Sequence, residues 1–141
     1  MKITELLIES VNDSKVDLID MLREFLPFVV NKLEIKTLPQ INLLAQIPDE
    51  EQPTFGRYDQ DARSLSLAII NRHPLDILRT LAHELAHHVQ NTENRLGPHS
   101  GDTGSDEENE AHELAGIVMR EFNKMHPEYF NTHTVEIPQP K

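Results

Sequence analysis

Two histidines and a glutamate stand close together near the middle of the chain. In the run His83-Glu84-Leu85-Ala86-His87 the two imidazoles lie four residues apart. Four residues make about one turn of an α-helix, so both rings leave the same face, about 40° apart, and can bind one divalent cation. Glu84 leaves the flank of that face, where its carboxylate can exchange a proton with a group close to the ion.

This spacing suits zinc. A catalytic zinc ion takes three protein ligands and leaves one position for water, whose pKa it lowers towards about 7. The pattern H-E-x-x-H on a helix supplies two neutral nitrogen ligands and a carboxylate beside them. We therefore predict that His83 and His87 bind zinc and that Glu84 is the catalytic base and acid of a hydrolytic site, and not a ligand.

The flanking sequence predicts that the motif lies inside a helix. Pro74 suits a first helical turn, and His73 would be the N-cap before it. Without a metal, the two histidines would be ordinary residues of an amphipathic helix, but Glu84 and the small Ala86 favour the metal site. The apolar residues that recur at helical spacing, and that we expect to be buried, are Leu78, Leu81, Ala82, Leu85 and Val89.

A third zinc ligand has to come from another segment. The next predicted helix, from Asp106 to about Lys124, begins with several carboxylates. Glu108 and Glu110 lie at opposite edges of its apolar face, so helical geometry favours Glu108 only slightly, and Glu113 is a further candidate. Ser105 and Glu108 also match a capping box, in which the carboxylate would bind the backbone N–H of Ser105 and leave Glu110 as the ligand.

The motif, taken together with the segment ENEAH at residues 108–112, resembles the gluzincin metallopeptidases, whose third ligand is the glutamate of a downstream E-x-x-A pattern. The chain is also similar to the small ImmA/IrrE-type proteins and minimal zincins. The resemblance covers roughly residues 38–125, and it implies that Glu108 is the third ligand in a zinc metalloendopeptidase that cleaves proteins or peptides. His112 departs from the family, which usually has Asp or Asn there to support the first metal histidine.

A second resemblance concerns the source of the chain. The segments GRY at 56–58 and NRHP at 71–74, with the motif and ENEA at 108–111, resemble small metallopeptidases encoded by tailed bacteriophages. That resemblance implies action in the cytoplasm of a bacterial host. Two other functions also fit an H-E-x-x-H helix, namely a zinc-stabilised interaction or regulatory module without catalysis, and a SprT-like DNA-associated protease. Glu84 disfavours the first, because a structural zinc site has no use for it.

Composition narrows the function classes. The chain has 141 residues, which suits one domain, with an expected core at about 13–125 and a tail at 126–141. Its formal net charge of −11 disfavours a nucleic-acid partner, and the absence of cysteine excludes disulfides and a cysteine zinc ribbon.

The start does not resemble a signal peptide, and no apolar run is long enough for a membrane span. We expect a cytoplasmic protein; the sequence leaves its oligomeric state open.

The order of elements predicts an α+β fold like that of the minimal zincins. Asp13 to about Lys32 should be a helix, kinked or divided at Pro27, after a loosely attached lead at 1–12. Strands are expected at 38–47, 55–58 and 64–70, and a loop at 91–104 should join the two metal-binding helices. Zincins commonly bind extended substrate along an edge strand, and 64–70 is the candidate for it, although an internal strand fits equally well.

The donor that would stabilise a developing oxyanion is not evident from the sequence. His88 should point about 100° away from His87 and is not expected to be a ligand. Gln90 lies on the metal face of the helix, where it either borders the cleft or packs in the core. Each candidate oxyanion donor has a structural alternative; the candidates are Tyr58, His99, His126, Tyr129 and His133.

Overall fold

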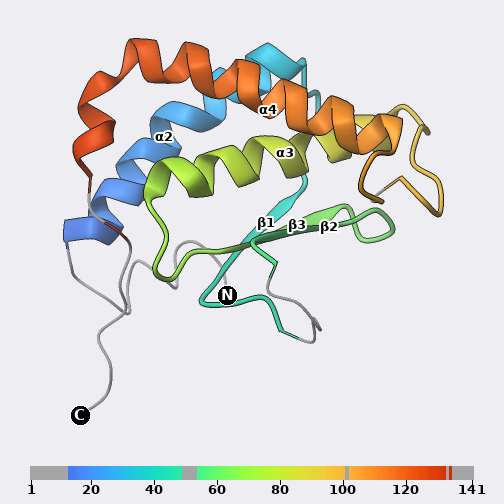
Figure 1. Cartoon of the computed structure of the whole chain (residues 1–141), viewed down its shortest axis with the longest axis horizontal. Coiled ribbons are helices and arrows are strands. Elements are labelled where there is room, and N and C mark those ends of the chain that lie inside the picture. The colour runs from blue at the N-terminus through green and yellow to red at the C-terminus, as the bar shows by residue number, and fades with distance from the viewer. Residues whose placement is uncertain (1–12, 49–53, 101, 133, 135–141) are drawn as a thin grey trace.

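The computed structural model describes residues 13–48, 54–100, 102–132 and 134, which form the predicted α+β fold (Figure 1). The expected lead at 1–12 lies outside these residues. The helices of the described part lie on one side of a small sheet, and α3 lies between the sheet and α4. In chain order the elements are α2 (Asp13–Leu33), β1 (Gln40–Leu44), β2 (Gly56–Asp59), β3 (Ser64–Ala68), α3 (Pro74–Thr92), α4 (Asp106–Met125) and the 3₁₀ helix η1 (Pro127–Asn131).

The three strands form a mixed sheet in the order β1-β3-β2. β3 runs parallel to β1 and antiparallel to β2, so of the two alternatives for 64–70 the internal strand is correct and the candidate edge strand is wrong. The short turn after Asp59, whose carboxylate accepts from the backbone N–H groups of Asp61 and Ala62, makes β2 and β3 a hairpin. The opposite edge of β3 pairs with β1. β2 therefore lies at an edge of the sheet.

The core forms where the sheet and the helices meet. Leu65 and Leu67 of β3 are fully buried under α3, while Phe25 of α2 meets Phe122 of α4 edge to face, with ring centroids 5.0 Å apart. α2 continues through Pro27 as a single helix, so the proline does not divide it. Burial of this apolar surface is the main driving force that holds the three helices on the sheet.

The expected tail begins with ordered structure. Directly after α4, η1 brings Tyr129 over Phe122, with ring centroids 5.9 Å apart. Residues 133 and 135–141 of the tail lie outside the described part of the chain. No helix among the described residues has the length and apolar character that crossing a membrane requires.

Candidate metal centre

The motif lies in the middle of α3, as predicted. His73 caps this helix, because its Nδ1 accepts from the backbone N–H of Leu75 at 3.0 Å, and Pro74 occupies the first turn. The cap and the proline determine the residue at which α3 begins. They therefore also determine which face of the helix carries the motif. His83 and His87 leave the same face, with their ring centroids 4.9 Å apart.

The carboxylate of Glu108 lies between the two rings. Its two oxygens are 2.8 Å from His83 Nε2 and 3.0 Å from His87 Nε2. One ligand atom from each of the three residues lies within 4.8 Å of the others, so the trio could hold a metal ion. Two imidazole nitrogens and one carboxylate oxygen are a donor set that suits zinc, and three protein ligands leave a position for a further group.

The capping question at the start of α4 is answered by two separate interactions. Ser105 caps α4 with its hydroxyl oxygen, which accepts from the backbone N–H of Glu108 at 3.1 Å. The side chain of Glu108 does not return to Ser105, whose own N–H binds the carbonyl of Asp102. The cap therefore forms through the backbone of Glu108 and leaves its carboxylate free to face the histidines.

Glu110, the alternative ligand, has a different role. Its Oε1 accepts from the side-chain amide of Gln90 at 3.0 Å, and its Oε2 is 2.8 Å from the guanidinium of Arg95. Arg95 and Gln90 both hold the pKa of Glu110 below its ordinary value. Glu113 is exposed and does not belong to the metal-binding trio. The geometry thus favours Glu108 over both alternatives.

Gln90 connects this network to the metal site. The residue is fully buried, and its Oε1 lies 2.8 Å from His87 Nδ1. The amide orientation is fixed, because its NH₂ group donates to two acceptors, the carbonyl of Glu107 and the carboxylate of Glu110. An amide oxygen only accepts, so His87 carries its proton on Nδ1 and keeps Nε2 available for a metal. Sequence reasoning placed Gln90 on the metal face but missed this role.

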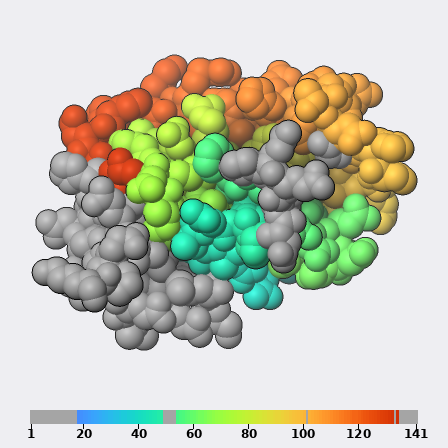
Figure 2. Space-filling view, turned by 60° about the horizontal axis from the view of Figure 1, so that its bottom comes forward, coloured from blue at the N-terminus to red at the C-terminus, as the bar shows by residue number. Residues whose placement is uncertain are grey.

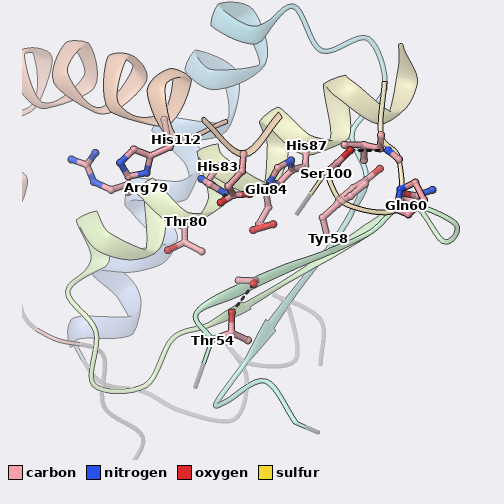
Figure 3. A pocket seen from close by; sticks show the side chains of 16 residues that line it. Thr54, Tyr58, Gln60, Arg79, Thr80, His83, Glu84, His87, Ser100 and His112 are labelled. Atoms are coloured by element: carbon pink, nitrogen blue, oxygen red, sulfur yellow. Dashed lines mark hydrogen bonds and ion pairs between the residues drawn. The ribbon is translucent and has the colours of Figure 1, made fainter. Parts of the chain in front are cut away.

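Glu84 differs from the other groups of the site. Its side chain points towards β2 and lines the cleft, and the residue is only 6% exposed (Figure 3). Within the described residues it has no hydrogen bond or ion pair. Burial, and to a smaller extent the neighbouring carboxylate of Glu108, together raise the pKa of Glu84 to about 8. A cation held by the trio would act in the opposite direction.

β2 approaches Glu84 closely, and this approach requires glycine at position 56. A Cβ atom there would clash with Cγ2 of Thr80 and lie 3.1 Å from Oε2 of Glu84. Thr80 cannot easily move aside, because its hydroxyl donates to the carbonyl of Asp76 and accepts from Arg72. Arg72 also donates to the carbonyl of Ala68 in β3 and thus ties the sheet to α3.

The site opens into a cleft of about 640 Å³ between β2, α3, the start of α4 and the connecting segment 93–105, of which residue 101 is not described. Figure 2 shows the β2–β3 hairpin and this segment close together at one side of the molecule. Alternate residues along β2 face the cleft. The lining residues from β2 and its ends are Thr54, Gly56, Tyr58 and Gln60.

Tyr58 is the only predicted oxyanion donor among the described residues that lines the cleft, but its hydrogen is already used. His88 Nε2 lies 2.7 Å from the carbonyl of Thr37 and must donate to it, so Nδ1 accepts from the Tyr58 hydroxyl at 2.8 Å. Asn91 donates to the same hydroxyl at 2.9 Å. Both ring nitrogens of His88 are therefore engaged away from the metal-binding trio, and Tyr58 joins β2 to α3.

The other predicted donors lie elsewhere. His99 is exposed beside Asp102, and His126 and Tyr129 stack together at the far end of α4. His133 is outside the described residues. His112, whose ring centroid is 6.4 Å from that of His83, lines the cleft without a hydrogen bond to His83 among the described groups. It therefore does not replace the expected supporting Asp or Asn.

Comparison of the chain with protein-family models, with curated proteins and with solved structures finds no match. The resemblance to gluzincins thus remains an expectation from the motifs. What the chain can do has to be argued from the geometry of this cleft.

Proposed function

We propose that the protein is a zinc-dependent metallopeptidase in which His83, His87 and Glu108 hold the ion and Glu84 is the general base and acid. The observation that carries this proposal is the state of Glu84. A carboxylate that is nearly buried, has no hydrogen-bond or ion-pair partner in the described part of the chain, and faces a cleft costs stability. A zinc site with a purely structural role would gain nothing from such a carboxylate.

The chemistry divides between the ion and the chain. When bound, zinc would polarise the scissile carbonyl and lower the pKa of a water molecule. The Glu84 carboxylate accepts a proton from the attacking water and passes it to the leaving amine, so the same group serves as base and then as acid. Gln90 fixes the tautomer of His87, and Gly56 leaves room for the Glu84 side chain.

An extended peptide would bind along β2. The backbone N–H of Ala68 binds the carbonyl of Phe55, so by the antiparallel alternation Phe55, Arg57 and Asp59 direct their backbone groups to β3. Gly56 and Tyr58 then direct theirs away from the sheet, where β2 pairs with no other described strand. These groups can pair with a substrate backbone by strand addition.

The test is hydrolysis of a mixed-sequence peptide library by the zinc-loaded protein, with the products detected by mass spectrometry. We expect cleavage by the wild type and none by Glu84→Gln, with zinc content equal in both. Glu24→Gln, an exposed substitution on α2 outside the cleft, is the matched control and should remain active. Cleavage by Glu84→Gln at the wild-type rate would refute the proposal, and a wild type that binds zinc but cleaves nothing would favour a zinc-stabilised module.

A further inference from the structure

One end of the cleft carries an arginine whose guanidinium forms no ion pair with any described residue. Arg79 lies one helical turn before His83 on α3, and it lines the cleft together with His112 of α4. In Figure 3 Arg79 and His112 lie on the same side of His83, and Tyr58 lies on the other. No ion pair or hydrogen bond of the Arg79 guanidinium occurs among the described residues.

Other arginines near the site have partners. Arg72 uses its guanidinium for the backbone carbonyls of Ala68 and Asp76 and for the hydroxyl of Thr80. Arg95 pairs with Glu93 and Glu110. These two arginines therefore support the fold, whereas Arg79, at one end of the cleft, has no such contacts among the described residues.

The described acidic groups that line the cleft form no ion pair with Arg79. Among the described residues, the lining contains two carboxylates, Glu84 and Glu108. Glu108 faces His83 and His87, and Glu84 is directed towards Gly56 on β2. The Arg79 end of the cleft thus offers N–H donors and a positive charge, which is the complement of a carboxylate.

The direction of β2 indicates which part of a peptide would reach Arg79. Gly56 lies against Thr80, Tyr58 binds His88, and the carbonyl of Gln60 accepts from Asn91, so β2 and α3 run in the same direction. Antiparallel pairing is slightly more stable per residue than parallel pairing. A peptide that pairs antiparallel with β2 runs from Gln60 towards Gly56, and its C-terminal side arrives at Arg79.

We propose that Arg79, with His112 beside it, forms a subsite that binds a carboxylate on the C-terminal side of the scissile bond. This inference rests on the proposed peptidase function and names the substrate class. The planar guanidinium can bind a carboxylate through two parallel hydrogen bonds. His112 retains one ring N–H even when neutral. The carboxylate belongs either to an acidic side chain or to the free C-terminus of the substrate.

Affinity for peptidyl hydroxamates tests the subsite without any need for turnover. The probes chelate the metal through the hydroxamate and extend a short alanine peptide from its C-terminal side, with either Glu or Gln in the chain and with a free or amidated C-terminus. Binding to the zinc-loaded protein is measured by calorimetry. The variants are Arg79→Gln and, as a control with the same change in charge, Arg120→Gln, because Arg120 is an exposed arginine of α4 outside the cleft.

We expect the carboxylate probes to bind about tenfold more tightly than the neutral amide probe, as a charge-assisted hydrogen bond would give. Arg79→Gln should abolish this difference, and Arg120→Gln should preserve it. A preference for Glu over Gln in amidated probes identifies a side-chain carboxylate, whereas a preference for free over amidated ends identifies the C-terminus. Equal affinity of all probes for the wild type, or a difference that survives in Arg79→Gln, would overturn the subsite.

Two further comparisons separate the possible failures. A hydroxamate that extends a peptide from its N-terminal side should show no advantage from a carboxylate, and an advantage found only there would overturn the proposed direction. If no hydroxamate binds the zinc-loaded wild type, the metal centre itself fails, and with it the proposed function. If all bind equally, the metal centre stands and only the Arg79 subsite is lost.

Discussion

The side-chain oxygen of Gln90 accepts a hydrogen bond from Nδ1 of His87, at 2.8 Å. This bond sets the tautomer of one predicted ligand before any metal arrives. Gln90 in turn is held by Glu107 and Glu110, and Glu110 is held by Arg95. Hydrogen bonds therefore connect Arg95 at the surface with His87 at the metal site. Glu110, the alternative to Glu108 as third ligand, is part of this chain.

Replacement of Gln90 should weaken zinc binding without removing a ligand. In Gln90→Leu, His87 loses its acceptor and becomes free to rotate or to change tautomer. Loss of such a supporting group typically weakens metal affinity 10- to 100-fold, and we expect an effect of about that size in competition with a chromophoric chelator. Gln40→Leu, on the exposed side of β1, is the control. An unchanged affinity in Gln90→Leu would show that the bond does not position His87.

Single substitutions should distinguish the ligand from its alternative. Native mass spectrometry of the zinc-loaded protein should show that His83→Ala and Glu108→Ala lose the ion, because each removes one of three donors. Glu110→Ala should keep the ion, since its carboxylate binds Gln90 and Arg95. The opposite pattern, with zinc lost in Glu110→Ala and kept in Glu108→Ala, would require α4 to turn when the metal binds.

Much of this site was predictable because it depends on local spacing. His83, Glu84 and His87 share one helix, and their positions follow from its 3.6-residue period. The choice of Glu108 over Glu110 was less certain, because both lie at the edges of one helical face and only the packing of α4 on α3 decides between them. Helix packing is a tertiary property that no short window of sequence contains.

The strand order was not predictable for a related reason. Ser64–Ala68 has the alternating pattern of a half-buried strand, and that pattern is the same for an edge strand and for an internal one. The role of Gly56 was also hidden, because it depends on contact with Thr80 and Glu84, more than twenty residues further along the chain. Gln90 lies three residues after His87, so helical spacing could have identified it as a partner.

Gly56→Ala should impair catalysis more than metal binding. The added methyl would meet Thr80 and the carboxylate of Glu84, so either β2 or Glu84 has to move. Overpacking of this kind costs about 1–3 kcal/mol in the free energy of unfolding. We expect a lower midpoint in urea denaturation and a lower kcat, with zinc content preserved. Gly104→Ala would be a poor control because of its positive φ, whereas Gly116→Ala on α4, where the added methyl would only make an ordinary contact with Arg120, suits the purpose. Full activity of Gly56→Ala would show that the close approach of β2 is not required.

We expect the folded protein to lose stability at high pH because of Tyr58. Burial raises the pKa of Tyr58 above its ordinary value of 10.0. Because the folded state favours the neutral phenol, the stabilisation is fully present below the unfolded pKa and is lost as the pH rises through the folded pKa. Tyr58→Phe should cost about 1 kcal/mol at neutral pH, through the lost bonds to His88 and Asn91, and should reduce the decline in stability above pH 10.

Two measurements check this prediction. Tyrosinate absorbance should rise with a midpoint above 10 in the folded protein, since burial also raises the pKa of the second tyrosine, Tyr129. Urea denaturation across the same pH range should then show the smaller decline in Tyr58→Phe. The matched control is Tyr129→Phe, which keeps the ring stacked on Phe122 and leaves the contacts between β2 and α3 intact. An ordinary midpoint for Tyr58, or equal stability of wild type and Tyr58→Phe at neutral pH, would mean that the hydroxyl does not join β2 to α3.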